Sequence, residues 1–180
     1  LSPVGERQSR VLAEHLHQLG VSFDRIYCGT LRRHVETAQP VLDYFNGQGS
    51  PLEPPELNDA FNEYDSASLM AARAQLTDKE GEITPDDFDV LRRDKKAFQA
   101  FFAETVQCWD IGDFDGMDGV EPWQRFCGRV DSGIKQLMGR HGRGKRLAVF
   151  TSGGPISVVF QMALGLSNTV AVSASWQILN

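Results

Sequence analysis

The turn at residues 28–33 carries the side chains best suited to bind a phosphate-like anion. Its sequence, Cys-Gly-Thr-Leu-Arg-Arg, follows a short apolar run and leads into a helical pattern. The free N–H groups and the positive dipole end of a helix N-terminus attract anions. Arg33, on the first turn of that helix, can add a two-pronged guanidinium contact, and the Thr30 hydroxyl can cap the helix or contact a phosphate oxygen. Taken alone, such a turn is more often an ordinary connection with a solvated arginine.

A second turn of the same design lies at residues 151–155, Thr-Ser-Gly-Gly-Pro. Ser152 places a hydroxyl at the mouth of the following helix, and Gly153 and Gly154 let the backbone bend and approach a ligand closely. Pro155 suits the first helical position. In open α/β sheets, ligands bind at the carboxyl ends of the strands, where both turns are expected. The prediction of an anion site therefore depends on the two turns together.

The elements that would position these turns follow from hydrophobic periodicity. The pattern predicts helices over residues 2–19, 31–45, 66–76, 95–109, 121–140 and about 155–164, and strands over residues 23–28, 146–150 and 169–179. Pro40 lies inside the second helix, where a kink or an early break is expected. Residues 77–89 are acidic and turn-rich, which is typical of a solvated surface insertion.

Helices between short apolar strands predict an α/β fold, a three-layer sandwich with a mainly parallel central sheet flanked by helices. The length of 180 residues suits a single domain. Because the first residues resemble a helix cap in mid-chain and the last ones stop inside an expected strand, we expect the parent protein to extend beyond both ends.

Composition narrows the classes of partner. The net charge of -6 argues against nucleic acid but allows a small anionic substrate in a pocket with local arginines. The three cysteines, Cys28, Cys108 and Cys127, are far apart and match no disulfide or metal pattern. We therefore expect reduced thiols in a cytoplasmic protein without a metal or cofactor. No apolar run is long enough to span a bilayer and no signal peptide is visible, so no membrane partner is expected. The oligomeric state is left open.

Four segments resemble the histidine phosphatase (phosphoglycerate mutase-like) superfamily. They are LSPVGERQ at residues 1–8, FDRIYCGTLRRHVETA at 23–38, LNDAFNEYD at 57–65 and AVFTSGGPI at 148–156. The resemblance implies the phosphoglycerate mutase-like fold and chemistry on a small phosphorylated substrate. Family members vary in the middle of the chain, which implies a variable helical insertion at about residues 66–120.

The resemblance also implies roles for individual residues. The arginine of the family signature x-Leu-x-Arg-x-x-x-Thr-Ala, a phosphate ligand, maps onto Arg33. The family's proton donor to the leaving group maps onto Glu63, which by composition alone could belong to a solvated acidic patch. Thr30, Ser152 and Gly153 complete the expected phosphate-binding set.

The nucleophile that the resemblance implies is a histidine in an Arg-His-Gly motif at the end of the first strand. The triplet Arg140-His141-Gly142 follows a helix and precedes a strand, so we expect it to be a helix end and surface loop. We expect the nucleophilic histidine upstream of Leu1, and surface roles for His15, His17 and His34.

Ser152 occupies the position of the family's second histidine. A hydroxyl can donate a neutral hydrogen bond but carries no positive charge, which costs on the order of a few kcal/mol of transition-state stabilisation. The sequence therefore predicts a phosphomonoester hydrolase that acts through a phosphohistidine. A non-catalytic relative that binds phosphate or a phosphorylated ligand is the alternative. A mutase is disfavoured because no lid that would exclude water is evident.

Overall fold

The computed structural model describes residues 1–80, 94–168 and 170–171, and the chain divides into two compact units. The first unit comprises residues 1–63 and 129–180, and the second comprises residues 64–128. The single domain with an insertion at about residues 66–120 stays a prediction.

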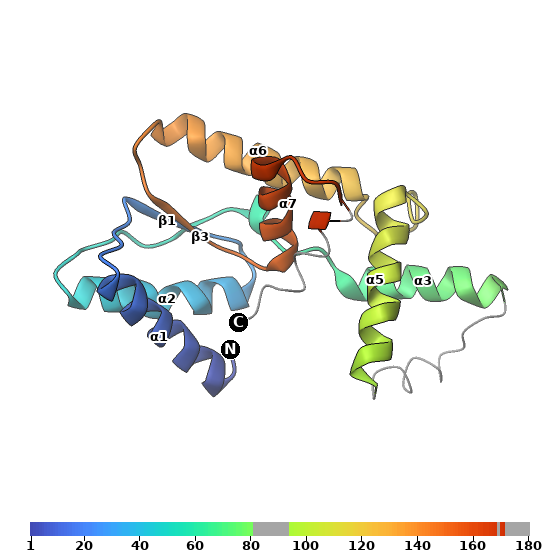
Figure 1. Ribbon diagram of the computed structural model, residues 1–180, viewed down its shortest axis with the longest axis horizontal. Coiled ribbons are helices and arrows are strands. Elements are labelled where there is room, and N and C mark those ends of the chain that lie inside the picture. The colour runs from blue at the N-terminus through green and yellow to red at the C-terminus, as the bar shows by residue number, and fades with distance from the viewer. Residues whose placement is uncertain (81–93, 169, 172–180) are drawn as a thin grey trace. The chain divides into compact units, whose positions relative to one another are not determined.

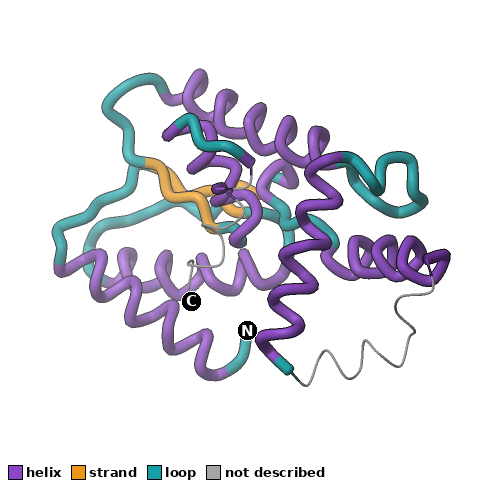
Figure 2. Tube along the Cα trace, turned by 45° about the vertical axis from the view of Figure 1, so that its right-hand side comes forward, coloured by secondary structure: helices purple, strands orange, loops and turns teal. Residues whose placement is uncertain are grey.

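Within the described residues, the first unit is built on a parallel three-stranded sheet in the order β2-β1-β3. Its strands are β1 (Arg25–Cys28), β2 (Glu56–Leu57) and β3 (Leu147–Phe150), the short orange segments of Figure 2. Cys28 lies opposite Leu57 and Phe150, so the carboxyl ends of all three strands are aligned. The turns that follow β1 and β3 therefore meet at one edge of the sheet. The predicted α/β class with a mainly parallel sheet is confirmed.

Helices cover both faces of this sheet, as Figure 1 shows. They are α1 (Pro3–Gln18) and α2 (Arg32–Gly47) on one face, and α7 (Gly153–Leu164) and the part of α6 (Trp123–His141) from residue 129 onward on the other. The first face buries Ala13, Val41 and Phe45, with Phe150 of β3 packed against them. The second buries Tyr27, Phe61 and Leu137, with Leu147 and Val149 packed against them. Strand alternation thus sends successive β3 side chains to opposite layers, and the predicted three-layer sandwich is confirmed.

Local chemistry sets the ends of α1. The Ser2 hydroxyl accepts the Gly5 N–H at 3.2 Å, and Pro3 takes the first helical position. Gly20 follows the helix with a φ of +67°, a left-handed conformation that glycine adopts without steric cost. The helix therefore begins and ends within one residue of its predicted bounds.

The predicted early break at Pro40 does not occur, because α2 continues through that residue to Gly47. An internal proline costs a helix about 3 kcal/mol. Burial of Val41 and Phe45 contributes about 1.5–3 kcal/mol for each side chain, which outweighs that loss.

The second unit contains α3 (Ser66–Glu80) and α5 (Lys95–Ile111), which pack on each other. The described part of α3 is longer than the helix predicted over residues 66–76. Thr77, expected in a solvated insertion, is fully buried, and its hydroxyl donates to the Arg73 carbonyl at 3.0 Å. That internal hydrogen bond satisfies the hydroxyl and makes its burial possible. Residues 81–89 of the predicted insertion lie outside the described residues.

The C-terminal part differs from expectation in two places. Helix α7 begins at Gly153, so Pro155 occupies the third helical position, where its missing N–H is still not required. Val170 and Ala171 are helical although the sequence predicts a strand from residue 169. The rest of that predicted strand lies outside the described residues.

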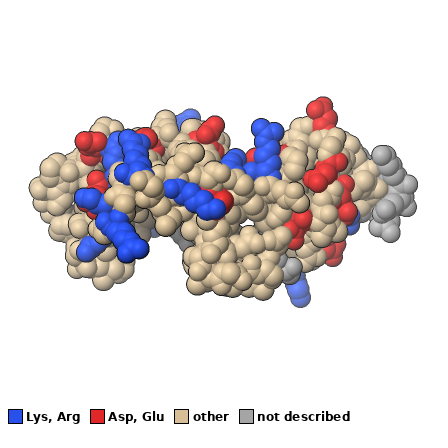
Figure 3. Space-filling view, turned by 90° about the horizontal axis from the view of Figure 1, so that it is seen from above, with Lys and Arg blue, Asp and Glu red and all other residues tan. Residues whose placement is uncertain are grey.

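Charge is distributed unequally between the two units. The first has eleven Lys and Arg against ten Asp and Glu, whereas the second has seven against fourteen. On the face shown in Figure 3, acidic side chains gather over the part of the molecule that contains α3 and α5. The unit that carries both predicted anion-binding turns is thus close to neutral. Among the described helices, none combines the length and apolar character needed to cross a membrane.

Candidate functional site

The two predicted turns meet through a backbone hydrogen bond. The Gly29 N–H, just after β1, donates to the Phe150 carbonyl at the end of β3 at 3.0 Å. A Cβ atom at residue 29 would lie 2.2 Å from His34 Nδ1 and 2.8 Å from the Phe61 carbonyl oxygen. Only glycine fits there without displacing its neighbours, so Gly29 fixes how closely α2 and the residue 61 loop approach the sheet edge.

A cavity of about 460 Å³ lies where α1, α2 and the turn between β3 and α7 converge. Three residues expected from the sequence, Arg33, Ser152 and Gly153, line it together. The Arg33 Nε–H donates to Ser152 Oγ at 3.2 Å. Within the described part of the chain, no other hydrogen bond or ion pair involves the guanidinium, so its terminal amino groups can bind a ligand.

His34 also lines this cavity, and its predicted surface role is wrong. The side chain is buried, at 2% exposure, and Nε2 lies 2.6 Å from Ser152 Oγ. Burial first, and the Arg33 charge second, lower the pKa of His34 from 6.5 to about 4. The imidazole is therefore neutral at physiological pH. The sequence held a signal for this, because His34 shares the helical spacing of Ala38, Val41 and Phe45, the buried stripe of α2.

Of the two roles expected for Thr30, the cap of α2 does not form, and the phosphate contact stays a prediction. The backbone N–H of Thr30 donates to Asn62 Oδ1 at 2.7 Å, and its hydroxyl accepts from Asn62 Nδ2 at 2.7 Å. It does not cap α2, which begins after Leu31 with no side-chain cap, and it is not among the residues that line the cavity. Thr30 instead ties the turn after β1 to the loop that precedes Glu63. Sequence reasoning missed Asn62, whose carbonyl accepts from Arg129 Nη1 at 2.7 Å.

Glu63 lies at the N-terminus of α7. Its Oε2 accepts the Gly154 N–H at 3.0 Å, which satisfies one of the backbone donors that a helix leaves unpaired at this end. Ser152 occupies the N-cap position of α7 but makes no side-chain cap, since its hydroxyl lies against Arg33 and His34. The Glu63 carboxyl group thus takes the position that a capping serine normally fills, and it is not among the residues that line the cavity beside Arg33.

The triplet Arg140-His141-Gly142 ends α6, as predicted, with Gly142 at a φ of +69°. His141 Nε2 lies 2.7 Å from the Tyr27 hydroxyl, in a part-buried pair. Neither residue lines the cavity that contains Arg33. His15 is exposed and His17 is half-buried, with its ring against Tyr44.

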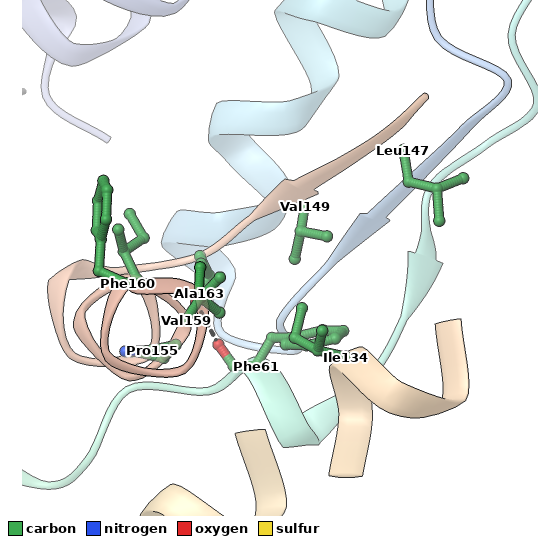
Figure 4. Close-up of a pocket in the computed structure, with 10 residues that line it drawn as sticks. Phe61, Ile134, Leu147, Val149, Pro155, Val159, Phe160 and Ala163 are labelled. Atoms are coloured by element: carbon green, nitrogen blue, oxygen red, sulfur yellow. Dashed lines mark hydrogen bonds between the residues drawn. The ribbon is translucent and has the colours of Figure 1, made fainter. Parts of the chain in front are cut away.

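A second cavity, of about 310 Å³, opens on the other side of β3. Figure 4 shows its apolar lining, with Leu147 and Val149 from β3, Phe61 and side chains of α6 and α7. Thr151 borders both cavities, and its hydroxyl donates to the Phe61 carbonyl at 2.6 Å, the dashed contact in Figure 4. No charged side chain lines this cavity among the described residues, whereas Arg33 lines the other one. The described residues contain no cluster of three or more His, Cys, Asp or Glu that could bind a metal.

The chain matches a known protein family over nearly its whole length. The family model described as the histidine phosphatase superfamily (branch 1) matches residues 1–176. No curated protein sequence matches the chain. A mycobacterial glucosyl-3-phosphoglycerate phosphatase superposes with a TM-score of 0.59, at 15% identity over 96% of this chain and 71% of its own.

Two further structures are similar. A phosphoglycerate mutase from Bacillus anthracis str. Sterne has a TM-score of 0.57, at 20% identity over 90% of this chain and 67% of its own. The alpha-ribazole phosphatase from Shigella flexneri has a TM-score of 0.56, at 21% identity over 99% of this chain and 72% of its own. Because the identities are this low, these likenesses show the fold alone. The chain spans about two thirds of the length of the first solved relatives that it matches.

Proposed function

Because this chain belongs to the histidine phosphatase superfamily (branch 1), we propose that the full-length protein is a phosphomonoester hydrolase that acts on a small phosphorylated substrate. The observation that carries the proposal is the cavity in which Arg33, Ser152 and Gly153 converge at the carboxyl ends of β1 and β3. A guanidinium and a helix N-terminus in one cavity supply the charge and the N–H donors that a phosphoryl group requires. Two of the structural neighbours are named as phosphatases and one as a mutase.

The proposed reaction has two steps. The phosphoryl group first passes from the substrate oxygen to a histidine nitrogen, while Glu63 gives its proton to the departing alkoxide. Water then attacks the phosphohistidine and returns a proton to Glu63, which releases inorganic phosphate and regenerates the histidine. Arg33 stabilises the negative charge of the transferring group in both steps.

Rapid acid-quench labelling of the full-length protein with a radioactive phosphomonoester tests this function. An acid-labile phosphoenzyme with steady release of phosphate is expected. Arg33→Met is expected to lower kcat/KM by about 10²–10³-fold, the usual effect of losing a transition-state donor. Arg32→Met is the matched control, because the exposed Arg32 pairs with Glu36 on the adjacent position of the same helix and lies outside the cavity. Equal losses in the two variants, or no labelled enzyme, would contradict the proposal.

The serine at residue 152 favours a second candidate, a non-catalytic protein that binds phosphate or a phosphorylated ligand. A test of this candidate must take His34 into account, because its Nε2 is only 2.6 Å from Ser152 Oγ. A histidine at residue 152 would occupy the space of that ring, so the substitution is made together with His34→Ala. Phosphate binding without turnover in the wild type, and turnover in the double variant, would support the second candidate. Robust wild-type turnover would exclude it.

A further inference from the structure

We propose that His34 is a positioning residue that turns the Ser152 hydroxyl into a hydrogen-bond donor for the bound anion. This inference rests on the proposed function, because it assigns a role within the same cavity. The two residues are far apart in the sequence: His34 follows Arg33, and Ser152 lies 118 positions further along the chain. The structure brings their side chains to 2.6 Å.

The first step of the argument is the number of hydrogen bonds that Ser152 Oγ makes. A serine hydroxyl has one proton to donate and two lone pairs that accept. The Arg33 Nε–H fills one lone pair at 3.2 Å. The contact with His34 Nε2 contains a single proton, which belongs either to the imidazole or to the serine. If the imidazole holds that proton, the serine can present its O–H to the cavity. If the serine holds it, only a lone pair faces the cavity.

The second step uses the other nitrogen of the ring. His34 Nδ1 is buried and has no hydrogen-bond partner within the described residues. A Cβ atom on Gly29 would lie 2.2 Å from Nδ1. The Cα hydrogen that takes the place of this Cβ therefore points at the nitrogen. A bare lone pair accepts such a C–H contact weakly, whereas an N–H would meet that hydrogen head-on. The neutral ring therefore carries its proton on Nε2.

The consequence for Ser152 follows directly. With Nε2–H donating to Oγ and Arg33 Nε–H donating to it as well, both lone pairs of the hydroxyl are engaged. The remaining O–H bond is directed away from these two donors, toward the cavity that Ser152 lines. Two donors on one oxygen also polarise its O–H bond, which strengthens the hydrogen bond that it gives to an anion. The neutral His34 thus acts on the ligand through Ser152.

A double-mutant cycle on the full-length protein tests this role, with inorganic phosphate as the probe in titration calorimetry. His34→Leu is shorter than the imidazole and loses the donor, and is expected to weaken phosphate binding about tenfold, the usual effect of one charge-assisted hydrogen bond. Ser152→Ala is expected to weaken it by a similar factor, and His34→Leu to add no further loss in the Ser152→Ala background. His34→Gln, whose amide can donate in place of Nε2, is expected to recover most of the affinity. Equal effects of His34→Leu with and without Ser152 would show a purely structural role and overturn the inference.

A second readout does not depend on phosphate. Long-range ¹H–¹⁵N correlation spectra of the imidazole nitrogens report which one is protonated, and Nε2–H is expected at pH 7. Protonation of Nδ1 would overturn the inference, even where phosphate binds. If the wild type binds no phosphate, the proposed function falls, and the tautomer still decides whether the serine hydroxyl is oriented as described.

Discussion

The buried imidazole of His34 makes a quantitative prediction about stability and pH. Its pKa is lowered from 6.5 to about 4, chiefly by burial. Between these two values the unfolded chain holds a proton on His34 that the native protein does not. The free energy of unfolding is therefore not reduced by His34 above about pH 6.5, and it falls as the pH drops toward 4.

The magnitude follows from the two pKa values. Between pH 7.5 and pH 5 the linkage amounts to about 2 kcal/mol of unfolding free energy, since each unit of pKa difference corresponds to about 1.4 kcal/mol. Urea unfolding of the full-length protein at pH 7.5, 6.5 and 5 measures it. His34→Gln is the matched comparison because it removes the titrating group and keeps a polar side chain of similar size.

The wild type is expected to lose about 2 kcal/mol more than His34→Gln over this range. Subtraction of the two profiles cancels the carboxylates and the other histidines, which both proteins share. Profiles that run parallel between pH 7.5 and pH 5 would refute the reasoning, because they would mean that His34 is as readily protonated in the native state as in the unfolded chain.

Three further changes test the framework of the site. Gly29→Ala forces a Cβ against His34 Nδ1 and is expected to lower the free energy of unfolding by about 2–3 kcal/mol. Gly47→Ala, with open space around it, is expected to be neutral or slightly stabilising. Thermal unfolding of the two variants measures the difference. Gly133→Ala places a Cβ 2.9 Å from Ala60 Cβ and is expected to lower stability by about 1–3 kcal/mol, whereas Gly139→Ala on the same helix is expected to raise it by up to about 1 kcal/mol, and the opposite order would contradict the packing of α6 on the residue 61 loop. Glu63→Gln is expected to slow hydrolysis of alkyl phosphates about 10²-fold and to affect aryl phosphates far less, because a good leaving group needs no proton; equal slowing of both classes would exclude a proton donor at this position.

The sequence predicted the layers of the first unit and the convergence of its two turns, and the reason is local. Strand-length apolar runs, the cap at Ser2 and the helical spacing around Arg33 are all encoded within a few residues of each element. The surface role of His34 and the Thr30 cap were wrong because the environment of each residue comes from a distant segment. His34 is buried by the turn that carries Ser152, and Thr30 is held by Asn62, 32 residues further along the chain. Such pairings depend on strand register, which local periodicity does not define.

The serine at residue 152 and the histidine at residue 34 are best understood as one arrangement. Because the two side chains share a hydrogen bond of 2.6 Å, a larger residue at either position would displace the other. Because the imidazole is neutral, Arg33 is the one charged side chain among the described residues that line the cavity. Glu63 Oε2 accepts the Gly154 N–H at the start of α7, so this N–H is not available to a ligand. Among the described residues, the proposed binding of a phosphoryl group in this cavity therefore depends on Arg33 for charge and on the oriented Ser152 hydroxyl for direction, so loss of either is expected to weaken it.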